Sequence, residues 1–356
     1  MTAEQHRPRA DGPDLAMLRD RARGCLLGGA IGDALGGPVE FLSLAAIRSR
    51  YGFGVDLDDP GLITDDTQLT LFTADGLIRA AISNHATGDG GDPTPQLWAA
   101  YQRWFLTQGP VDPFPETDDW LLGHRGLWAA RAPGNTCVAA LRGGRPGRTD
   151  DAINHSKGCG GVMRAAPAGF APEAKAAYRT GCDLAALTHG HPSGWISAGA
   201  LALLVHLLAV ADQPLTVALL EVEHAVSAEP DGAEVRDALA LAVDAARRAP
   251  GDTAMVTSLG EGWVAEEALA IAVYAVLSHP HGTVAALRLA VEHGGDSDST
   301  GAIAGNILGA MLGTAALPVD WLARVELADL IGTVADDLVD AYAGDVARLT
   351  DRYPVS

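Results

Sequence analysis

One segment near the N-terminus has the sequence Gly24-Cys-Leu-Leu-Gly-Gly-Ala-Ile-Gly-Asp-Ala-Leu-Gly-Gly-Pro-Val-Glu40-Phe41. Its apolar residues recur with helical spacing, which predicts a helix over Leu18–Leu35. The chain has 42 glycines in 356 residues, and many stand beside alanine in apolar stretches like this one. Because small side chains let helices approach closely, the pattern indicates a fold of tightly packed helices.

The rest of the chain has the same character. Alternating runs of β-branched and aromatic residues are missing, and aromatic residues make up only 5% of the sequence. We therefore expect an all-α protein: a flexible tail over residues 1–17, then a single compact orthogonal multi-helix domain over residues 18–356. Order is least certain at His85–Pro95 and Gly109–Asp119, which are rich in Gly, Pro and Asp. The further predicted helices are Asp66–Ala81, Gln96–Leu106, Asn135–Leu141, Pro172–Thr188, Gly194–Val210, Leu215–Ser227, Ala233–Arg247, Ala265–Leu277, Thr283–His293, Ser299–Leu312 and Ala328–Ala343.

Composition limits the partners. The formal net charge of -20 opposes general binding to nucleic acid or to anionic membranes, and the short Arg142–Arg148 stretch resembles a loop rather than a basic patch. The most apolar run, Ile196–Val210, is too short for a bilayer span and predicts a buried helix. The four cysteines show no zinc-site spacing, and Met1–Leu15 lacks a signal sequence. We expect a cytoplasmic protein and a monomer.

Two acidic segments carry the candidate functional residues. Gly61-Leu-Ile-Thr-Asp-Asp-Thr-Gln-Leu-Thr70 and Gly294-Gly-Asp-Ser-Asp-Ser-Thr-Gly-Ala-Ile-Ala-Gly305 each precede or open a predicted helix. Helix capping would explain either segment alone, because Asp, Ser and Thr are preferred caps and acidic residues suit the first turn. Capping does not explain why the carboxylates come in pairs, Asp65 with Asp66 and Asp296 with Asp298.

Four carboxylates brought together would repel one another unless a cation neutralised them. The available donors are oxygens, with no Cys or His at ligand spacing, so hard divalent ions fit better than zinc or copper. Two ions, Mg²⁺ or alternatively Mn²⁺, would balance four negative charges. The residues by themselves indicate a two-metal cleft and leave its substrate open.

These segments and four others resemble, in order, the ADP-ribosylglycohydrolase family, which includes the dinitrogenase-reductase-activating glycohydrolases and the ADP-ribosylarginine hydrolases. The resemblance extends from Arg23 to Gly313. The other four segments are Gly24–Phe41, Lys157-Gly-Cys-Gly-Gly-Val-Met-Arg-Ala-Ala-Pro167, Thr188-His-Gly-His191 and Gly260-Glu-Gly-Trp-Val-Ala-Glu-Glu-Ala-Leu269.

The resemblance implies roles for particular residues. Asp65 or Asp66 is the expected catalytic base, and Glu40 is expected to contact or gate the substrate ribose, although a solvated acid is its plain alternative. The implied metal ligands are Thr64, Asp65, Asp66, Asp296, Asp298 and Ser299. The implied substrate-binding residues are Glu40, Gly158, Cys159, Gly160, Gly161, Val162, Met163, His189 and Trp263.

Plain alternatives apply to the substrate-binding set as well. The Gly158–Met163 segment would offer N–H groups to the pyrophosphate, or form an ordinary turn. His189 would lie near ADP-ribose or be a core histidine, and Trp263 would stack on adenine or pack in the core. Cys159 differs from the small polar residue that relatives often have there. Asp33 is expected to brace the end of the opening helix. For Met163 and Arg164 the alternative to ligand contact is packing and buttressing.

The implied reaction is hydrolysis of the bond between ADP-ribose and an acceptor, with ADP-ribosylarginine on protein as first choice. ADP-ribosylserine, O-acetyl-ADP-ribose and an ADP-ribosylated nucleobase remain open as small-molecule or macromolecular substrates. Two other classes are a non-catalytic ADP-ribose-binding protein and a two-metal phosphatase. Product analysis separates them, because only the first reaction liberates free ADP-ribose.

Overall fold

Helices form nearly all of the regular structure. The computed structural model describes residues 14–52, 54–88, 90–109, 114 and 117–355. Within those ranges strand pairing is limited to isolated bridges, so the predicted all-α, single-domain fold is confirmed. The α-helices are α1 (Leu15–Gly36), α2 (Leu44–Tyr51), α3 (Asp65–Thr87), α4 (Thr94–Thr107), α5 (Asn135–Gly143), α6 (Ala174–Ala186), α7 (Pro192–Ala209), α8 (Leu215–Ser227), α9 (Ala233–Arg248), α10 (Thr253–Leu259), α11 (Ala265–Ser278), α12 (Thr283–Val291), α13 (Ser297–Leu312), α14 (Val319–Arg324) and α15 (Ala328–Tyr342). Short 3₁₀ helices are η1 (Arg125–Leu127), η2 (Cys159–Gly161), η3 (Ala166–Phe170) and η4 (Thr314–Ala316).

Each predicted helix is present, and the differences lie at the ends. Helix α1 begins at Leu15 rather than Leu18, because Asp14 caps it by accepting the Ala16 N–H at 2.9 Å; the expected tail is therefore too long at its C-terminal side. Helix α3 continues to Thr87, and Gly88 ends it in the left-handed conformation, so the first residues of the uncertain segment His85–Pro95 are helical. The other uncertain segment, Gly109–Asp119, lies partly outside the described residues.

Helix α7 is the apolar core helix that the sequence predicts. It is long and apolar enough to cross a membrane by length and composition, but 89% of its residues are buried inside the protein. Burial by neighbouring helices accounts for its all-round hydrophobicity. The helix packs against α6, η3 and α8.

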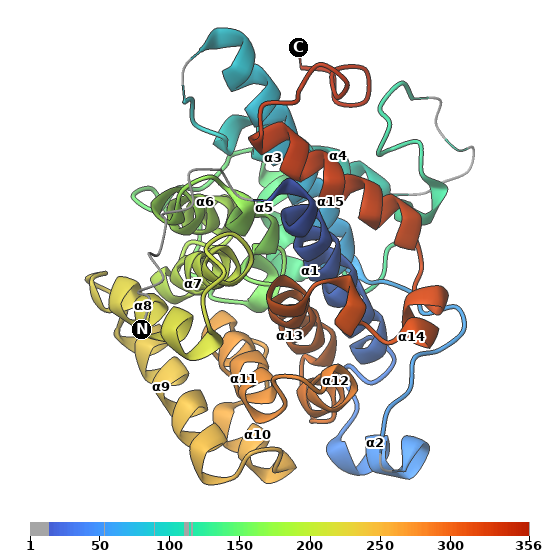
Figure 1. The fold of residues 1–356 in the computed structure, drawn as a ribbon, viewed down its shortest axis with the longest axis vertical. Helices are drawn as coiled ribbons and strands as arrows, with labels where there is room; N and C mark the ends of the chain where they lie inside the picture. Colours follow the sequence, from blue (N-terminus) through green and yellow to red (C-terminus); the bar gives the residue numbers. More distant parts are fainter. Residues whose placement is uncertain (1–13, 53, 89, 110–113, 115–116, 356) are drawn as a thin grey trace, which may run out of the picture.

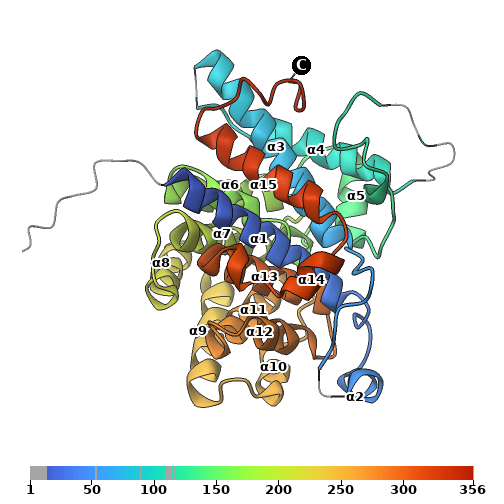
Figure 2. The ribbon, with the colours of Figure 1, turned by 45° about the vertical axis from the view of Figure 1, so that its right-hand side comes forward.

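The centre of the fold is the antiparallel crossing of α1 and α13, which lie side by side in Figure 1 and again in the turned view of Figure 2. Glycines four residues apart on one helix face glycines four residues apart on the other. The closest approaches pair Gly24 with Gly309, Gly28 with Gly305, and Gly32 with Gly301.

Backbone touches backbone along this crossing. A Cβ atom at Gly32 would lie 1.9 Å from the carbonyl oxygen of Gly301, and one at Gly305 would lie 1.9 Å from that of Gly28. No larger residue fits either position without separating the helices. At the far end Gly36 meets Ser297 in the same way, so the last turn of α1 lies against the first turn of α13.

We expect Gly32→Ala to lower the free energy of unfolding by about 1–3 kcal/mol or more, because the added methyl group overpacks the crossing. The matched control is Gly332→Ala in α15, where a Cβ atom meets nothing within 4 Å. This control should be neutral or stabilising by up to about 1 kcal/mol, since alanine is the better helix former. Urea denaturation of the two variants checks the difference, and equal stabilities would contradict the role of the crossing.

Candidate metal centre

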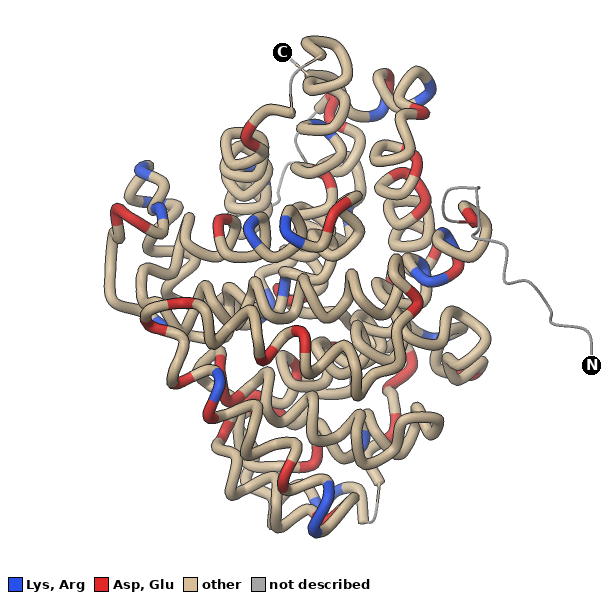
Figure 3. Tube along the Cα trace, turned by 60° about the vertical axis from the view of Figure 1, so that its left-hand side comes forward, with Lys and Arg blue, Asp and Glu red and all other residues tan. Residues whose placement is uncertain are grey.

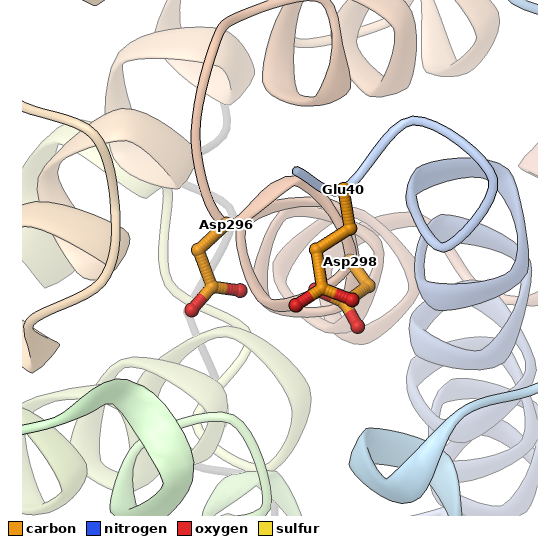
Figure 4. A group of neighbouring side chains, drawn as sticks. All are labelled: Glu40, Asp296 and Asp298. Atoms are coloured by element: carbon orange, nitrogen blue, oxygen red, sulfur yellow. The ribbon is translucent and has the colours of Figure 1, made fainter. Parts of the chain in front are cut away.

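Carboxylates from the end of α1 and the start of α13 meet at one place. One ligand oxygen each from Glu40, Asp296 and Asp298 lies within 4.8 Å of the other two. Figure 4 shows the carboxylates of Glu40 and Asp298 next to each other, and the carboxylate of Asp296 faces this pair from the left. The α1–α13 crossing explains this meeting, because it holds Gly36 against Ser297 and thereby places the residues beyond them at the same end.

Glu40 belongs to the turn that ends α1. Its N–H donates to the carbonyl oxygen of Gly36 at 2.9 Å, so its backbone position follows from the helix end. The side chain is half-buried, and one of its oxygens lies within 4.8 Å of an oxygen of Asp296 and of Asp298. The family resemblance implies a glutamate near the metals at this position, and its contact with the substrate ribose stays a prediction.

The start of α13 fixes the second acidic pair. Asp296 is the N-cap, and one of its oxygens accepts the Ser299 N–H at 3.3 Å. Asp298 accepts the same N–H at 2.9 Å. Asp296, Asp298 and Ser299 are all buried. Asp296 and Asp298 therefore do cap the helix, but capping uses only one oxygen of each carboxylate.

The start of α3 is held by Asp33, a buried residue of α1. Its carboxylate accepts the N–H of Thr64 at 3.0 Å and that of Thr67 at 3.1 Å, and also the Thr67 hydroxyl. Burial raises the pKa of Asp33 to about 6, while these donors favour its charged form. The Asp33 side chain therefore braces the start of α3, whereas the sequence predicts that it braces the end of the opening helix, to which it belongs.

The first acidic pair is buried at this helix start. Thr64 caps α3 by accepting the Asp66 N–H at 3.3 Å, and Asp65 accepts the Gly134 N–H at 3.2 Å. The Oδ2 atom of Asp66 is buried and has no hydrogen-bond partner in the described part of the chain. Burial, and then the charges of Asp33, Asp65 and Asp296, raise the pKa of Asp66 well above its ordinary value. The two acidic pairs thus lie within electrostatic range of each other.

No cation of the described chain offsets this concentration of negative charge. The ion pairs of the described residues join other groups, such as Asp75 with Arg79 and Arg131 with Glu326. Burial and then the charge of Asp296 raise the pKa of Glu40 to about 8. For Asp298, burial and then the charges of Asp66 and Asp296 raise the pKa well above the usual range.

These observations fit a hard divalent cation. The donors are carboxylate and hydroxyl oxygens, which Mg²⁺ and Mn²⁺ prefer, and the unpartnered Asp66 Oδ2 is an oxygen that needs a positive partner. A divalent ion would replace the repulsion among the carboxylates by attraction. The residues that would hold it are Glu40, Thr64, Asp65, Asp66, Asp296, Asp298 and Ser299.

The glycine-rich segment predicted to bind pyrophosphate borders this centre. Its first residues pair with the segment around Trp263: the Cys159 N–H donates to the Trp263 carbonyl at 3.2 Å, and Gly158 forms a bridge with Val264. Residues Cys159–Gly161 then make one turn of 3₁₀ helix. Met163 reaches the acidic centre, with its Sδ 3.7 Å from the Ser299 hydroxyl.

His189 lies beneath this segment. It is 1% exposed, and Cβ atoms built on Gly158 and Gly160 would be in contact with its ring. Burial and then the charge of Arg164 lower the pKa of His189 to about 3, so the imidazole is neutral. Arg164 is fully buried and donates to the Thr188 hydroxyl at 2.7 Å, which agrees with the predicted buttressing. Ligand contact by His189 stays a prediction.

Trp263 forms an exposed aromatic pair with Phe41. The rings stack at 5.4 Å between centroids with an interplanar angle of 22°, and Phe41 is 70% exposed. Phe41 has φ of 65°, a conformation that bulky residues rarely adopt. Together with His293 and Gly294 the pair borders a cavity of about 450 Å³ beside the acidic centre. Trp263 is therefore not a core residue, and a planar ligand could reach it.

The raised pKa values predict how stability depends on pH and metal. Without divalent cation, the folded protein binds more protons than the unfolded chain between about pH 4 and about pH 8, so stability should fall as pH rises through this window. Saturating Mg²⁺ should reverse the trend, and Glu40→Gln should flatten it. Thermal unfolding in chelator and in Mg²⁺ measures both effects. A melting temperature that rises with pH in chelator would rule out this electrostatic description.

Comparison with known proteins agrees with the geometry. A family model described as ADP-ribosylglycohydrolase matches residues 14–348. The ADP-ribosyl-[dinitrogen reductase] glycohydrolase of Rhodospirillum rubrum is 26% identical over 324 residues, which cover 87% of this chain and 92% of that protein. The ADP-ribosylarginine hydrolase Tri1 of Pseudomonas putida (strain GB-1) is 26% identical over 337 residues, covering 90% of this chain and 78% of that one.

A solved structure described as an ADP-ribosylglycohydrolase-related protein complex has the same fold, with a TM-score of 0.61 and 26% identity. The superposition covers 92% of this chain and 99% of that chain. Since the family model spans almost the whole described chain, the protein belongs to the ADP-ribosylglycohydrolase family.

Proposed function

We propose that this protein is a divalent-metal-dependent hydrolase that releases ADP-ribose from ADP-ribosylarginine in proteins. The observation that carries the proposal is the gathering of Glu40, Asp296 and Asp298 within 4.8 Å of one another, without a basic partner in the described chain. The arginine acceptor is supported by the name of the Pseudomonas putida relative. Two ions, Mg²⁺ first and Mn²⁺ second, are proposed from the number of carboxylates.

The divalent ions, when bound, would neutralise the clustered carboxylates and offer positive charge to ribose oxygens. The chain's own residues would orient the ribose and handle the proton. Asp66 is the proposed base, because its Oδ2 is buried and no described residue forms a hydrogen bond with it. It would take a proton from water as the water oxygen bonds to the anomeric carbon of the ribose. The electrons of the carbon–nitrogen bond pass to the guanidine nitrogen, which takes up a proton from solvent as it leaves, and Asp66 afterwards returns its proton to solvent.

Positive charge develops on the ribose as that bond breaks. The carboxylates of Glu40 and Asp65 would stabilise this charge, and the burial of Asp65 away from bulk water strengthens its part of the interaction. Gly158–Met163 would hold the pyrophosphate and Trp263 would stack on a planar group of the substrate. Serine-linked ADP-ribose, O-acetyl-ADP-ribose and ADP-ribosylated nucleobase are the alternative substrates. A non-catalytic role as a structural or ADP-ribose-binding protein has less support. Buried carboxylates that repel one another would serve no purpose in a purely structural protein.

General nucleic-acid binding is not proposed. Figure 3 shows Lys and Arg scattered among Asp and Glu on the face in view rather than gathered into one area. A cytoplasmic location and a monomeric state stay predictions from the sequence.

The test is release of free ADP-ribose from an ADP-ribosylarginine peptide with Mg²⁺, with Mn²⁺ and with chelator. We expect metal-dependent release, and Asp66→Asn should reduce the rate at least about 100-fold, the usual contribution of a general base. The variant should remain folded in chelator, since it removes one of several repelling charges. Asp237→Asn on the surface of α9 is the matched control and should retain full activity.

Free ADP-ribose from a serine-linked peptide alone would reassign the acceptor. Liberated phosphate would move the protein to the phosphatase class. An Asp66→Asn enzyme with normal turnover would remove this residue from the chemistry, and Asp65→Asn would be examined next.

A further inference from the structure

A cysteine side chain lies directly against the acidic centre. The Sγ atom of Cys159 is 2.7 Å from Oδ2 of Asp296, while the other oxygen of Asp296 accepts the Ser299 N–H. Cys159 is the first residue of η2, so its position follows from the glycine-rich turn. A sulfur donor is thus added to a set that otherwise consists of oxygen atoms.

Two further observations extend this feature beyond a single thiol. The Oδ2 atom of Asp66, a carboxylate of the same acidic centre, is buried and has no hydrogen-bond partner among the described residues. A second sulfur atom, Sδ of Met163, lies 3.7 Å from the Ser299 hydroxyl. Soft sulfur and unpartnered oxygen together form a donor set for a thiophilic ion.

Cys159 is also the one cysteine that solvent reaches. The chain has four cysteines, and Cys25, Cys137 and Cys182 are buried whereas Cys159 is partly exposed. Of the four thiols, only that of Cys159 can therefore bind a thiophilic cation from solvent while the protein stays folded. Buried thiols in apolar surroundings are inert by comparison.

We propose that Cys159 and Asp296 form a binding site for a thiophilic divalent cation such as Zn²⁺ or Cd²⁺, in competition with the hard ion of the acidic centre. On binding, the thiol loses its proton to solvent and a sulfur–metal bond replaces the hydrogen bond to Asp296. Asp66 is the third donor. Because the thiophilic ion takes Asp296 away from the oxygen set, it acts as an inhibitor of the metal centre.

The geometry requires only a small adjustment. In a tetrahedral zinc site with Zn–S of about 2.3 Å and Zn–O of about 2.1 Å, the two donors are about 3.5 Å apart. The present Sγ to Oδ2 separation is 2.7 Å, so the distance between these two atoms must increase by about 0.8 Å when the ion binds. Rotation of the partly exposed Cys159 side chain provides this movement without displacing a helix.

The test uses Cd²⁺ as probe on the full-length, reduced, chelator-treated protein, and follows the ultraviolet sulfur-to-cadmium charge-transfer absorption. We expect an absorption band that saturates at one Cd²⁺ per protein chain and whose intensity corresponds to a single thiolate ligand. Cys159→Ser should abolish the band and weaken Cd²⁺ binding by more than the roughly 10- to 100-fold that loss of an outer-shell partner costs. Mg²⁺ should still raise the melting temperature of this variant, which shows that it is folded. Cys182→Ser is the matched control and should keep the band.

A band that persists in Cys159→Ser, or no band in the unmodified protein, would overturn the proposal. Excess Mg²⁺ should shift the Cd²⁺ titration to higher concentration, because both ions need Asp296; a titration unaffected by Mg²⁺ would also overturn it. The proposal rests on the acidic centre and not on the acceptor, and the readout does not involve turnover. Failure of the ADP-ribose release assay is therefore distinguishable from failure here.

Discussion

The contact of glycine backbone on glycine backbone between α1 and α13 is the constraint on which the rest of the structure depends. Helices that touch without intervening side chains have a fixed separation and register, because any slip would drive a Cβ atom into a carbonyl group. The antiparallel register puts the end of α1 beside the start of α13. Glu40 follows the first of these helix ends, and Asp296 and Asp298 lie at the second.

The same helix α1 also positions the other acidic pair. Asp33 projects from it to hold the amides at the start of α3, which places Asp65 and Asp66 near the α1–α13 junction. The centre is thus assembled by one helix through two kinds of contact, close packing and hydrogen bonding. Its electrostatic cost is high, because desolvation and repulsion both oppose the charged forms of the carboxylates. That cost is consistent with a site shaped for cations rather than for stability of the metal-free chain.

Much of this architecture could be predicted from the sequence. Helical periodicity located the twelve long elements, and the doubled aspartates indicated the two halves of the centre. The short helices α2, α10 and α14 were missed, since a helix of two turns has too few residues for a periodic signal. The distances that join Glu40 to Asp296 and Asp298, and the contact of Cys159 with Asp296, depend on tertiary packing and cannot be read from sequence spacing. One local signal was available in retrospect: glycines at four-residue spacing in both Gly24–Gly36 and Gly301–Gly309 mark the two faces that meet.

Diffraction from crystals grown with Mn²⁺, with data collected for its anomalous signal, tests the central claim most directly. We predict anomalous density between the starts of α3 and α13, within bonding distance of Asp66 and Asp298 and close to Glu40. Density elsewhere on the protein, or none at this place with the ion in excess, would contradict the assignment of these carboxylates as a metal centre.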